Sequence, residues 1–207
     1  MRLLVLGASG GVGSRLVAQA VAAGHEVTAQ TRTPGRIPSP AVEAVGHPTD
    51  AAFLARYVAG QDAIAFCVGV DTSRPTTLFS DAARALIAAM EPAGARRVAI
   101  LTGIGAGDTR GHGGWLYNRV IYPLFTRNRY EDKTRQEAVM EASALDWTIV
   151  RAAPFVSRAG PAPLEVHETI PPGLQLRAIT RDEVATFMLR TLEKGSHLRQ
   201  KIFVGRP

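Results

Sequence analysis

The sequence predicts a single α/β domain in three layers, with a doubly wound parallel sheet between two layers of helices. Short, wholly apolar segments alternate along the chain with longer segments whose apolar residues recur at helical spacing. Strands of that kind belong to parallel sheets covered on both faces, and such strands are joined by crossover helices. With 207 residues, of which 46% are hydrophobic, the chain can bury one sizeable core, so we expect one domain over residues 1–207.

The first element pair is the most informative part of the chain. Residues 3–6 form a wholly apolar run that ends at Gly7. Three glycines then follow in the spacing G-x-x-G-x-x-G, and apolar residues recur with helical period until Gly24. A second apolar segment covers Val27–Gln30. The order strand, glycine turn, helix, strand is that of a βαβ unit.

The glycine spacing indicates a dinucleotide site. Gly7 permits a tight turn, Gly10 lets the backbone approach a pyrophosphate, and Gly13 lets the helix pack close to the sheet. The helix N-terminus adds free N–H groups and the positive end of the helix dipole. The expected contacts are Gly7, Ser9, Gly10, Gly11, Val12 and Gly13.

The end of the second strand favours NADP(H) over NAD(H). A free ribose 2′-OH is usually held there by Asp or Glu, whereas a 2′-phosphate needs positive charge and hydroxyl donors. The chain has Thr31, Arg32 and Thr33, and no acid lies between Glu26 and Glu43. We therefore expect Arg32 and Thr33 to bind the cofactor; Arg32 could instead be an ordinary solvated arginine.

The rest of the chain repeats this alternation. We expect Thr49 or Asp50 to cap the second helix and Thr180 to cap the last one. Six glycines in residues 103–114 form a loop suited to a lid, and we expect residues 103–125 and 152–180 to form the substrate crevice. The further expected strands cover residues 41–45, 62–68, 98–101, 147–151 and 201–204, and the further helices residues 50–58, 77–91, 130–143 and 181–193.

Several candidate site residues stand at the carboxyl ends of expected strands, where open parallel sheets bind their ligands. Gly69, Thr102 and Arg151 are expected there. The Thr102 hydroxyl lies where a nicotinamide ring and a substrate carbonyl would meet, or else caps the following turn. Cys67, the only cysteine, is in an apolar run and is expected to be a buried thiol without a catalytic role.

Four sequence segments together resemble an atypical short-chain dehydrogenase/reductase. They are the glycine turn, Thr102–Gly105, Tyr130–Lys133 with Glu137, and Leu145–Arg151. The group that the chain resembles most includes NmrA-like proteins and biliverdin/flavin reductases, and the similarity spans nearly the whole chain. It implies a Rossmann fold, an NAD(P)H cofactor whose nicotinamide ribose is held by Lys133, and a place beside the adenine for His47. His47 could instead start a turn before Pro48.

The proton donor departs from the classical pattern, in which a lysine four residues after a tyrosine lowers the tyrosine pKa. No tyrosine here has a lysine at that distance. The position four residues before Lys133 is Arg129, and Tyr130 is turned by about 100° around the helix. Lys133, Thr102, Tyr117 and Tyr130 remain the catalytic candidates, and the proton could also come from water. His112, in the glycine loop, is a further candidate.

The resulting prediction is an NADPH-dependent reductase that transfers hydride to a small conjugated or carbonyl acceptor such as a flavin, a quinone or an enone. The alternative is a non-catalytic NADP(H) sensor of the NmrA-like type, which binds a protein partner. A sensor usually has extra chain for a partner surface, so the compact size favours the enzyme. A monomer or a homodimer is compatible with either function.

Charge and composition make other functions less favourable. The net charge is +6, but the 24 basic residues are scattered, so no nucleic acid is expected as a partner. The lack of an 18-residue apolar run and of a signal-like segment predicts a cytoplasmic protein without a membrane partner. The five histidines are far apart in the sequence, so no metal site is expected.

Overall fold

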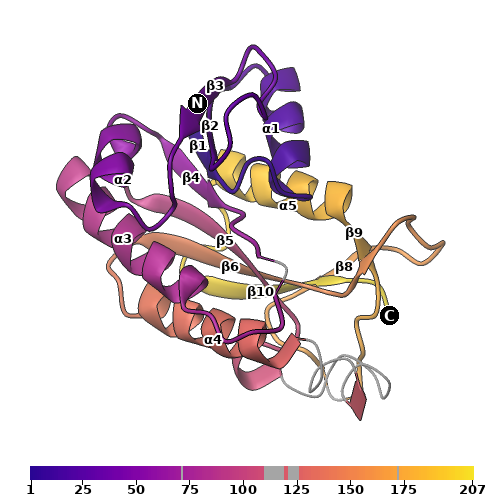
Figure 1. Ribbon diagram of the computed structural model, residues 1–207. Coiled ribbons are helices and arrows are strands. Elements are labelled where there is room, and N and C mark those ends of the chain that lie inside the picture. Colours follow the sequence, from indigo (N-terminus) through magenta and orange to yellow (C-terminus); the bar gives the residue numbers. More distant parts are fainter. Residues whose placement is uncertain (71, 110–118, 121–125, 172) are drawn as a thin grey trace.

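The predicted doubly wound, three-layer architecture is confirmed by a computed structural model, which describes residues 1–70, 72–109, 119–120, 126–171 and 173–207 (Figure 1). The main sheet is built from β1 Arg2–Leu6, β2 Glu26–Thr31, β3 Val42–Val45, β4 Ala63–Phe66, β5 Arg97–Gly103, β6 Asp146–Ala152, β8 Glu165–His167 and β10 Gln200–Gly205. The strand order is β3-β2-β1-β4-β5-β6-β10-β8. All neighbouring pairs are parallel except β10 and β8.

Helices cover both faces of this sheet. They are α1 Gly13–Ala22, α2 Ala51–Val58, α3 Leu78–Ala93, α4 Arg127–Glu141 and α5 Arg181–Lys194. Figure 1 shows α1 and α5 on one face and α2, α3 and α4 on the other. Each face has its own buried core: Leu16 and Val184 belong to the first, and Leu86 and Met140 to the second. None of the helices in the described ranges is long and apolar enough to cross a membrane.

The winding of the chain reverses beside β1, which pairs with β2 on one side and with β4 on the other. Ligands of doubly wound sheets bind at such a reversal, beyond the carboxyl ends of the strands. Gly7 follows β1, and Cys67 follows β4, so these two segments meet at the reversal. The strand order therefore places the segments that follow β1 and β4 at the expected binding site.

Two predicted helix starts are confirmed by their capping contacts. The Asp50 carboxylate accepts hydrogen bonds from Ala52 N at 2.9 Å and Phe53 N at 3.1 Å. Thr180 and Glu183 form a reciprocal capping box at the start of α5. α4 begins at Arg127 and not at Tyr130 as predicted, so Arg129 is helical as well.

The sequence did not predict the short strands β7 Phe155–Val156, β8 and β9 Ile179–Thr180, or the 3₁₀ turn Gly107–Thr109. Strands of two or three residues are too short to show the alternation of apolar and polar residues that marks a strand in a sequence. They form because they pair with distant segments of the chain. β8, for example, exists because it pairs antiparallel with β10 at the edge of the sheet. β7 and β8 lie in residues 154–173 and the 3₁₀ turn lies in the glycine-rich residues 103–114, where the sequence predicts neither a helix nor a strand.

Candidate functional site

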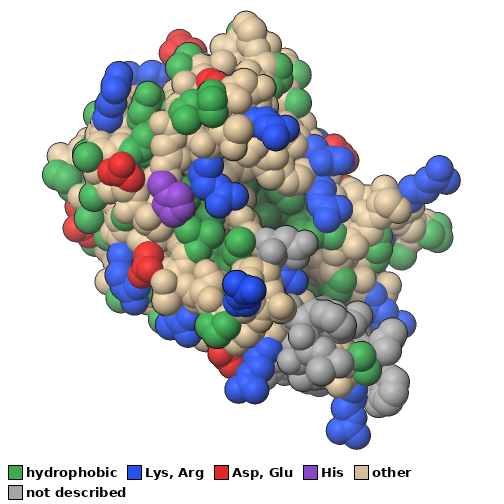
Figure 2. Space-filling view, viewed as in Figure 1, with side chains coloured by type: hydrophobic (Ala, Val, Ile, Leu, Met, Phe, Trp, Pro, Cys, Tyr) green, Lys and Arg blue, Asp and Glu red, His purple; other side chains and the backbone are tan. Residues whose placement is uncertain are grey.

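A cavity of about 790 Å³ opens at the carboxyl ends of the strands. It is lined by the glycine turn after β1, by the segment after β4, and by the ends of β2, β5 and β6 with the residues that follow β2 and β6. The first residues of α3, α4 and α5 complete the lining. Figure 2 shows the hollow with apolar side chains inside it and cationic side chains around it. A cavity of this size is within the range of natural ligand sites, and it lies at the sheet reversal.

The glycine turn has the geometry that a phosphate site requires. Gly7 has a φ of +75°, and a Cβ there would lie 2.6 Å from the Cys67 carbonyl oxygen. A Cβ at Gly13 would lie 2.2 Å from the Gly7 oxygen, so α1 packs directly on the turn. Gly10 lines the cavity. Val12 provides no capping side chain for α1, so the N-terminal backbone of this helix is available to an anion.

Polar side chains connect this turn to the end of β2. The Gln30 side chain accepts a hydrogen bond from Gly7 N at 2.8 Å and donates one to the Gly46 oxygen at 2.6 Å. The Thr31 hydroxyl lies 3.3 Å from that of Ser9. Ser9, Thr31 and Arg32 all line the cavity, whereas Thr33 does not. Ser9, Thr31 and Arg32 thus all border the cavity near the end of β2.

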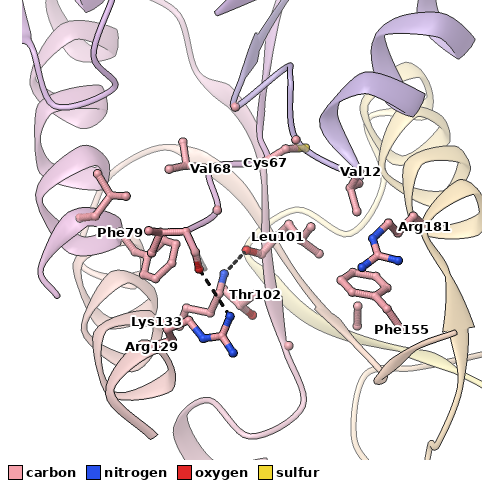
Figure 3. Close-up of a pocket in the computed structure, with 18 of the residues that line it drawn as sticks. Val12, Cys67, Val68, Phe79, Leu101, Thr102, Arg129, Lys133, Phe155 and Arg181 are labelled. Atoms are coloured by element: carbon pink, nitrogen blue, oxygen red, sulfur yellow. Dashed lines mark hydrogen bonds between the residues drawn. The ribbon is translucent and has the colours of Figure 1, made fainter. Parts of the chain in front are cut away.

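Arg181, the first residue of α5, is a candidate cofactor residue that the sequence analysis missed. It lines the cavity, and its guanidinium lies over the Phe155 ring at 4.8 Å (Figure 3). A Cβ at Gly11 would lie 2.8 Å from its Cδ and Nε, so the side chain extends over the glycine turn. No local pattern marks this residue, because Gly11 and Arg181 are far apart in the sequence.

Lys133 extends from α4 into the opposite wall of the cavity. Its Nζ donates a hydrogen bond to the Leu101 oxygen at 3.0 Å and lies 4.5 Å from the centre of the Phe79 ring. Burial lowers the pKa of Lys133 to about 8, although the nearby Glu137 carboxylate opposes that shift. Cys67 is buried, as predicted, and burial raises the pKa of its thiol to about 12. At neutral pH this wall therefore holds an ammonium group and an uncharged thiol.

The helix that carries Lys133 is anchored by a buried carboxylate. Asp132 accepts hydrogen bonds from Phe79 N at 2.8 Å and from the Ser80 hydroxyl at 2.6 Å. Both donors lie in the first turn of α3, so a residue of α4 caps α3. This contact fixes α4 against α3 and thereby places Lys133.

Thr102 and Arg151 meet at a buried carboxylate. They are neighbours in the register of β5 and β6, and both contact Glu137 of α4. The Thr102 hydroxyl donates to Glu137 Oε1 at 2.6 Å, and Arg151 binds both carboxylate oxygens at 3.1 and 2.6 Å. The Arg151 side chain is only 1% exposed and does not line the cavity, whereas Thr102 does. Arg151 thus fixes the Glu137 carboxylate in place, and the Thr102 hydroxyl proton is engaged in a hydrogen bond to that carboxylate.

The remaining candidates are placed differently from one another. Tyr130 lines the cavity, and its hydroxyl is so close to Gly103 that a Cβ there would lie 2.7 Å away. Gly69 lines the cavity with open space around it. His47 lines a second hollow and lies 2.7 Å from the Thr49 hydroxyl. Tyr117 and His112 lie outside the described residues.

Only part of the two segments predicted to form the substrate crevice, 103–125 and 152–180, lines the cavity among the residues that the structure describes. Gly103 and residues 152–155 line the cavity, but the later part of 152–180 includes β8 at the sheet edge. Residues 110–118 and 121–125 lie outside the described part of the chain. Within that part, no group of three His, Cys, Asp or Glu side chains is suited to a metal ion.

The sheet reversal, the glycine turn and the cavity together define a dinucleotide-binding protein of the Rossmann fold. The model of the NAD(P)H-binding family matches residues 7–195, and the chain therefore belongs to that family.

Several solved structures have a similar fold. An oxidoreductase, ylbE, from Lactococcus lactis has a TM-score of 0.84 at 16% identity, over 100% of this chain and 91% of that one. ChuY, an anaerobillin reductase from Escherichia coli O157:H7, has a TM-score of 0.81 at 20% identity, over 100% and 98%. A wide-type short-chain dehydrogenase/reductase from Veillonella parvula in complex with NADP has a TM-score of 0.81 at 17% identity, over 100% and 94%.

Proposed function

We propose that this protein is an NADPH-dependent reductase of the atypical short-chain dehydrogenase/reductase type, which transfers hydride to a flavin, a quinone or an enone. The observation that carries this proposal is that the glycine turn, Thr102 and Lys133 line the same cavity. The solved structures of similar fold given above also include an oxidoreductase and an anaerobillin reductase.

The residues of the cavity fit NADPH from one end to the other. The free N-terminus of α1 and Arg181 would hold the pyrophosphate, while Ser9, Thr31 and Arg32 would hold the 2′-phosphate. Lys133 would contact the nicotinamide ribose. Bound there, NADPH would supply the hydride that, together with one proton from solvent, reduces the acceptor by two electrons and leaves NADP⁺.

On the protein side, the residues position the reactants and provide positive charge. The Lys133 ammonium group is held in place by the Leu101 oxygen and faces a partly apolar wall, where it stabilises negative charge on the acceptor. Because the Thr102 hydroxyl donates to Glu137, its oxygen is left to accept a hydrogen bond. The site therefore favours acceptors whose reduced anion takes its proton from water.

A direct test measures NADPH oxidation by the purified protein over a panel of flavins, quinones and enones, with cofactor binding measured in parallel by calorimetry. Turnover with at least one acceptor class supports the reductase. Cofactor binding without any turnover would instead favour the non-catalytic NADP(H) sensor.

Cofactor choice is expected to depend on Arg32. Replacing Arg32 with alanine should weaken NADPH binding by roughly 10- to 150-fold, because a hydrogen bond to a charged group contributes about 1.5–3 kcal/mol. NADH affinity should change little, since NADH has no 2′-phosphate. Calorimetric titration with both cofactors measures this difference. Arg36→Ala, at an exposed arginine outside the cavity, is the control, and equal losses for both cofactors would contradict the assignment.

Tyr130 is not expected to be an essential acid. A positioned acid or base contributes about 100- to 10,000-fold, so loss of such a group is easily detected. We expect Tyr130→Phe to lower kcat by less than about a hundredfold, because water can supply the proton. The same holds for Tyr117→Phe. A larger loss with intact NADPH affinity would identify that tyrosine as the acid.

A further inference from the structure

The loop between β2 and β3 leads from the cavity to the edge strand of the main sheet (Figure 1). It begins with Arg32, which lines the cavity and directly follows Thr31, the last residue of β2. It contains three prolines and is largely exposed until β3 begins at Val42. An exposed loop keeps one course only where other groups bind its backbone.

The Glu43 side chain, on β3, binds the backbone of this loop. Its carboxylate accepts hydrogen bonds from Gly35 N at 2.9 Å, Arg36 N at 2.8 Å and Ile37 N at 3.1 Å. Gly35 has a φ of +74°, and a left-handed residue of this kind turns successive N–H groups toward one point. These N–H groups, those of Gly35 and Arg36 above all, hold the pKa of the Glu43 carboxyl below its usual range. The carboxylate is therefore charged at neutral pH and keeps the loop closed.

The start of the loop has an anchor of its own. The Thr31 hydroxyl accepts a hydrogen bond from Thr33 N at 3.3 Å and lies 3.1 Å from the Thr33 oxygen. Arg32 thus stands between two fixed points, the Thr31 hydroxyl before it and the Glu43 carboxylate after it. Because the backbone on both sides is held, the Arg32 side chain starts from a defined position at the border of the cavity.

The same contacts keep the carboxylate of Glu43 away from the cofactor. An acid that follows the second strand usually binds the ribose 2′-OH of NAD(H). Glu43 is the first acidic residue after β2, but its two oxygens are bound to three backbone N–H groups, and it does not line the cavity. The charge of this residue therefore acts on the loop and not on a ribose.

We propose that Glu43 is a positioning residue, which strengthens the preference for NADPH over NADH by holding Arg32 at the 2′-phosphate. This inference rests on the proposed NADPH cofactor. Glu43 does not touch the cofactor and acts only through the loop. A loop that is ordered before binding loses less conformational entropy when the 2′-phosphate binds. NADH gains nothing from this order, because it has no group for Arg32 to bind.

The test measures NADPH and NADH affinity by calorimetry in the wild type, in Glu43→Ala, in Arg32→Ala and in the double variant. We expect Glu43→Ala to weaken NADPH binding by roughly 2- to 10-fold, the range for ordering one long side chain, and to leave NADH binding unchanged. Glu43→Gln keeps one acceptor oxygen and should lose less. Once Arg32 is alanine, Glu43→Ala should have no further effect on either cofactor. Glu26→Ala is the matched control, because Glu26 is exposed at the opposite end of β2 and does not line the cavity.

The outcomes separate this proposal from the cofactor assignment, and none of them requires turnover. If Arg32→Ala lowers the ratio of NADPH to NADH affinity but Glu43→Ala does not, Glu43 has no positioning role and the assignment of Arg32 stands. Equal losses for both cofactors in Glu43→Ala, or a loss of NADPH affinity that persists without Arg32, would also overturn the positioning role, because they indicate a general effect on the fold. If Arg32→Ala itself leaves the ratio unchanged, both proposals are wrong.

Discussion

Gly10→Val is expected to abolish NADPH binding while the protein remains folded. Gly10 lines the cavity, and a Cβ there would lie 3.1 Å from the Gly7 oxygen, a tight contact that a small shift of the turn relieves. The two methyl groups of valine would then occupy the space that the pyrophosphate needs. We expect NADPH affinity to fall by more than about a hundredfold, as measured by calorimetry, with an unchanged circular dichroism spectrum.

The control for this variant is Gly160→Val. Gly160 is exposed and has open space around its Cβ position, so the same substitution should leave NADPH affinity intact. Gly13→Ala provides a contrast, because its Cβ would collide with the backbone of Gly7. That variant should lose folding stability in addition to cofactor affinity. Retained NADPH affinity in Gly10→Val would contradict the assignment of the glycine turn to phosphate.

Glu137→Gln is expected to destabilise the protein by about 3–5 kcal/mol in the free energy of unfolding. The substitution keeps the shape of the side chain but removes the charge that balances the buried Arg151 guanidinium, and breaking a buried ion pair costs that much. Urea denaturation measures the loss. The Thr102 hydroxyl also loses a charged acceptor, so the wall of the cavity should be disturbed in the folded variant.

The matched control is Glu131→Gln on the same helix. Glu131 pairs with Arg127 at 2.8 Å, but both side chains are substantially exposed. Exposed pairs of this kind contribute less than about 1 kcal/mol, so this variant should be nearly as stable as the wild type. If Glu131→Gln and Glu137→Gln lost similar amounts of unfolding free energy, the buried triad of Thr102, Glu137 and Arg151 would not be the cause of the destabilisation.

The parts of the site that the sequence predicted are those with a local signal. The turn at Gly7 is recognisable because glycine spacing, a preceding strand and a following helix occur within one βαβ unit. Thr180 is recognisable as a cap because its partner, Glu183, stands three residues later. Each of these features depends on residues that are close in the chain.

The features that could not be predicted depend on distant residues. Arg181 reaches the glycine turn only because α5 packs beside α1, and nothing near it in the sequence signals a phosphate. Arg151 stands at a strand end, as a cofactor residue would, yet it pairs with Glu137 on the α4 side of the sheet. Thr102 and Arg151 project from the same face because they are register partners, and that register pairs two segments that are distant in the chain.

The side chain of Arg181 over the glycine turn has a kinetic consequence for cofactor exchange. If Arg181 binds the pyrophosphate as we propose, its ion pair with the cofactor must break before NADP⁺ leaves. The Arg181 guanidinium also stacks on the Phe155 ring, which gives the side chain a second partner when that ion pair breaks. Product release often limits turnover in enzymes of this kind. The dissociation rate of the oxidised cofactor would then depend on the strength of its ion pair with one arginine, at a distance from the bond that reacts.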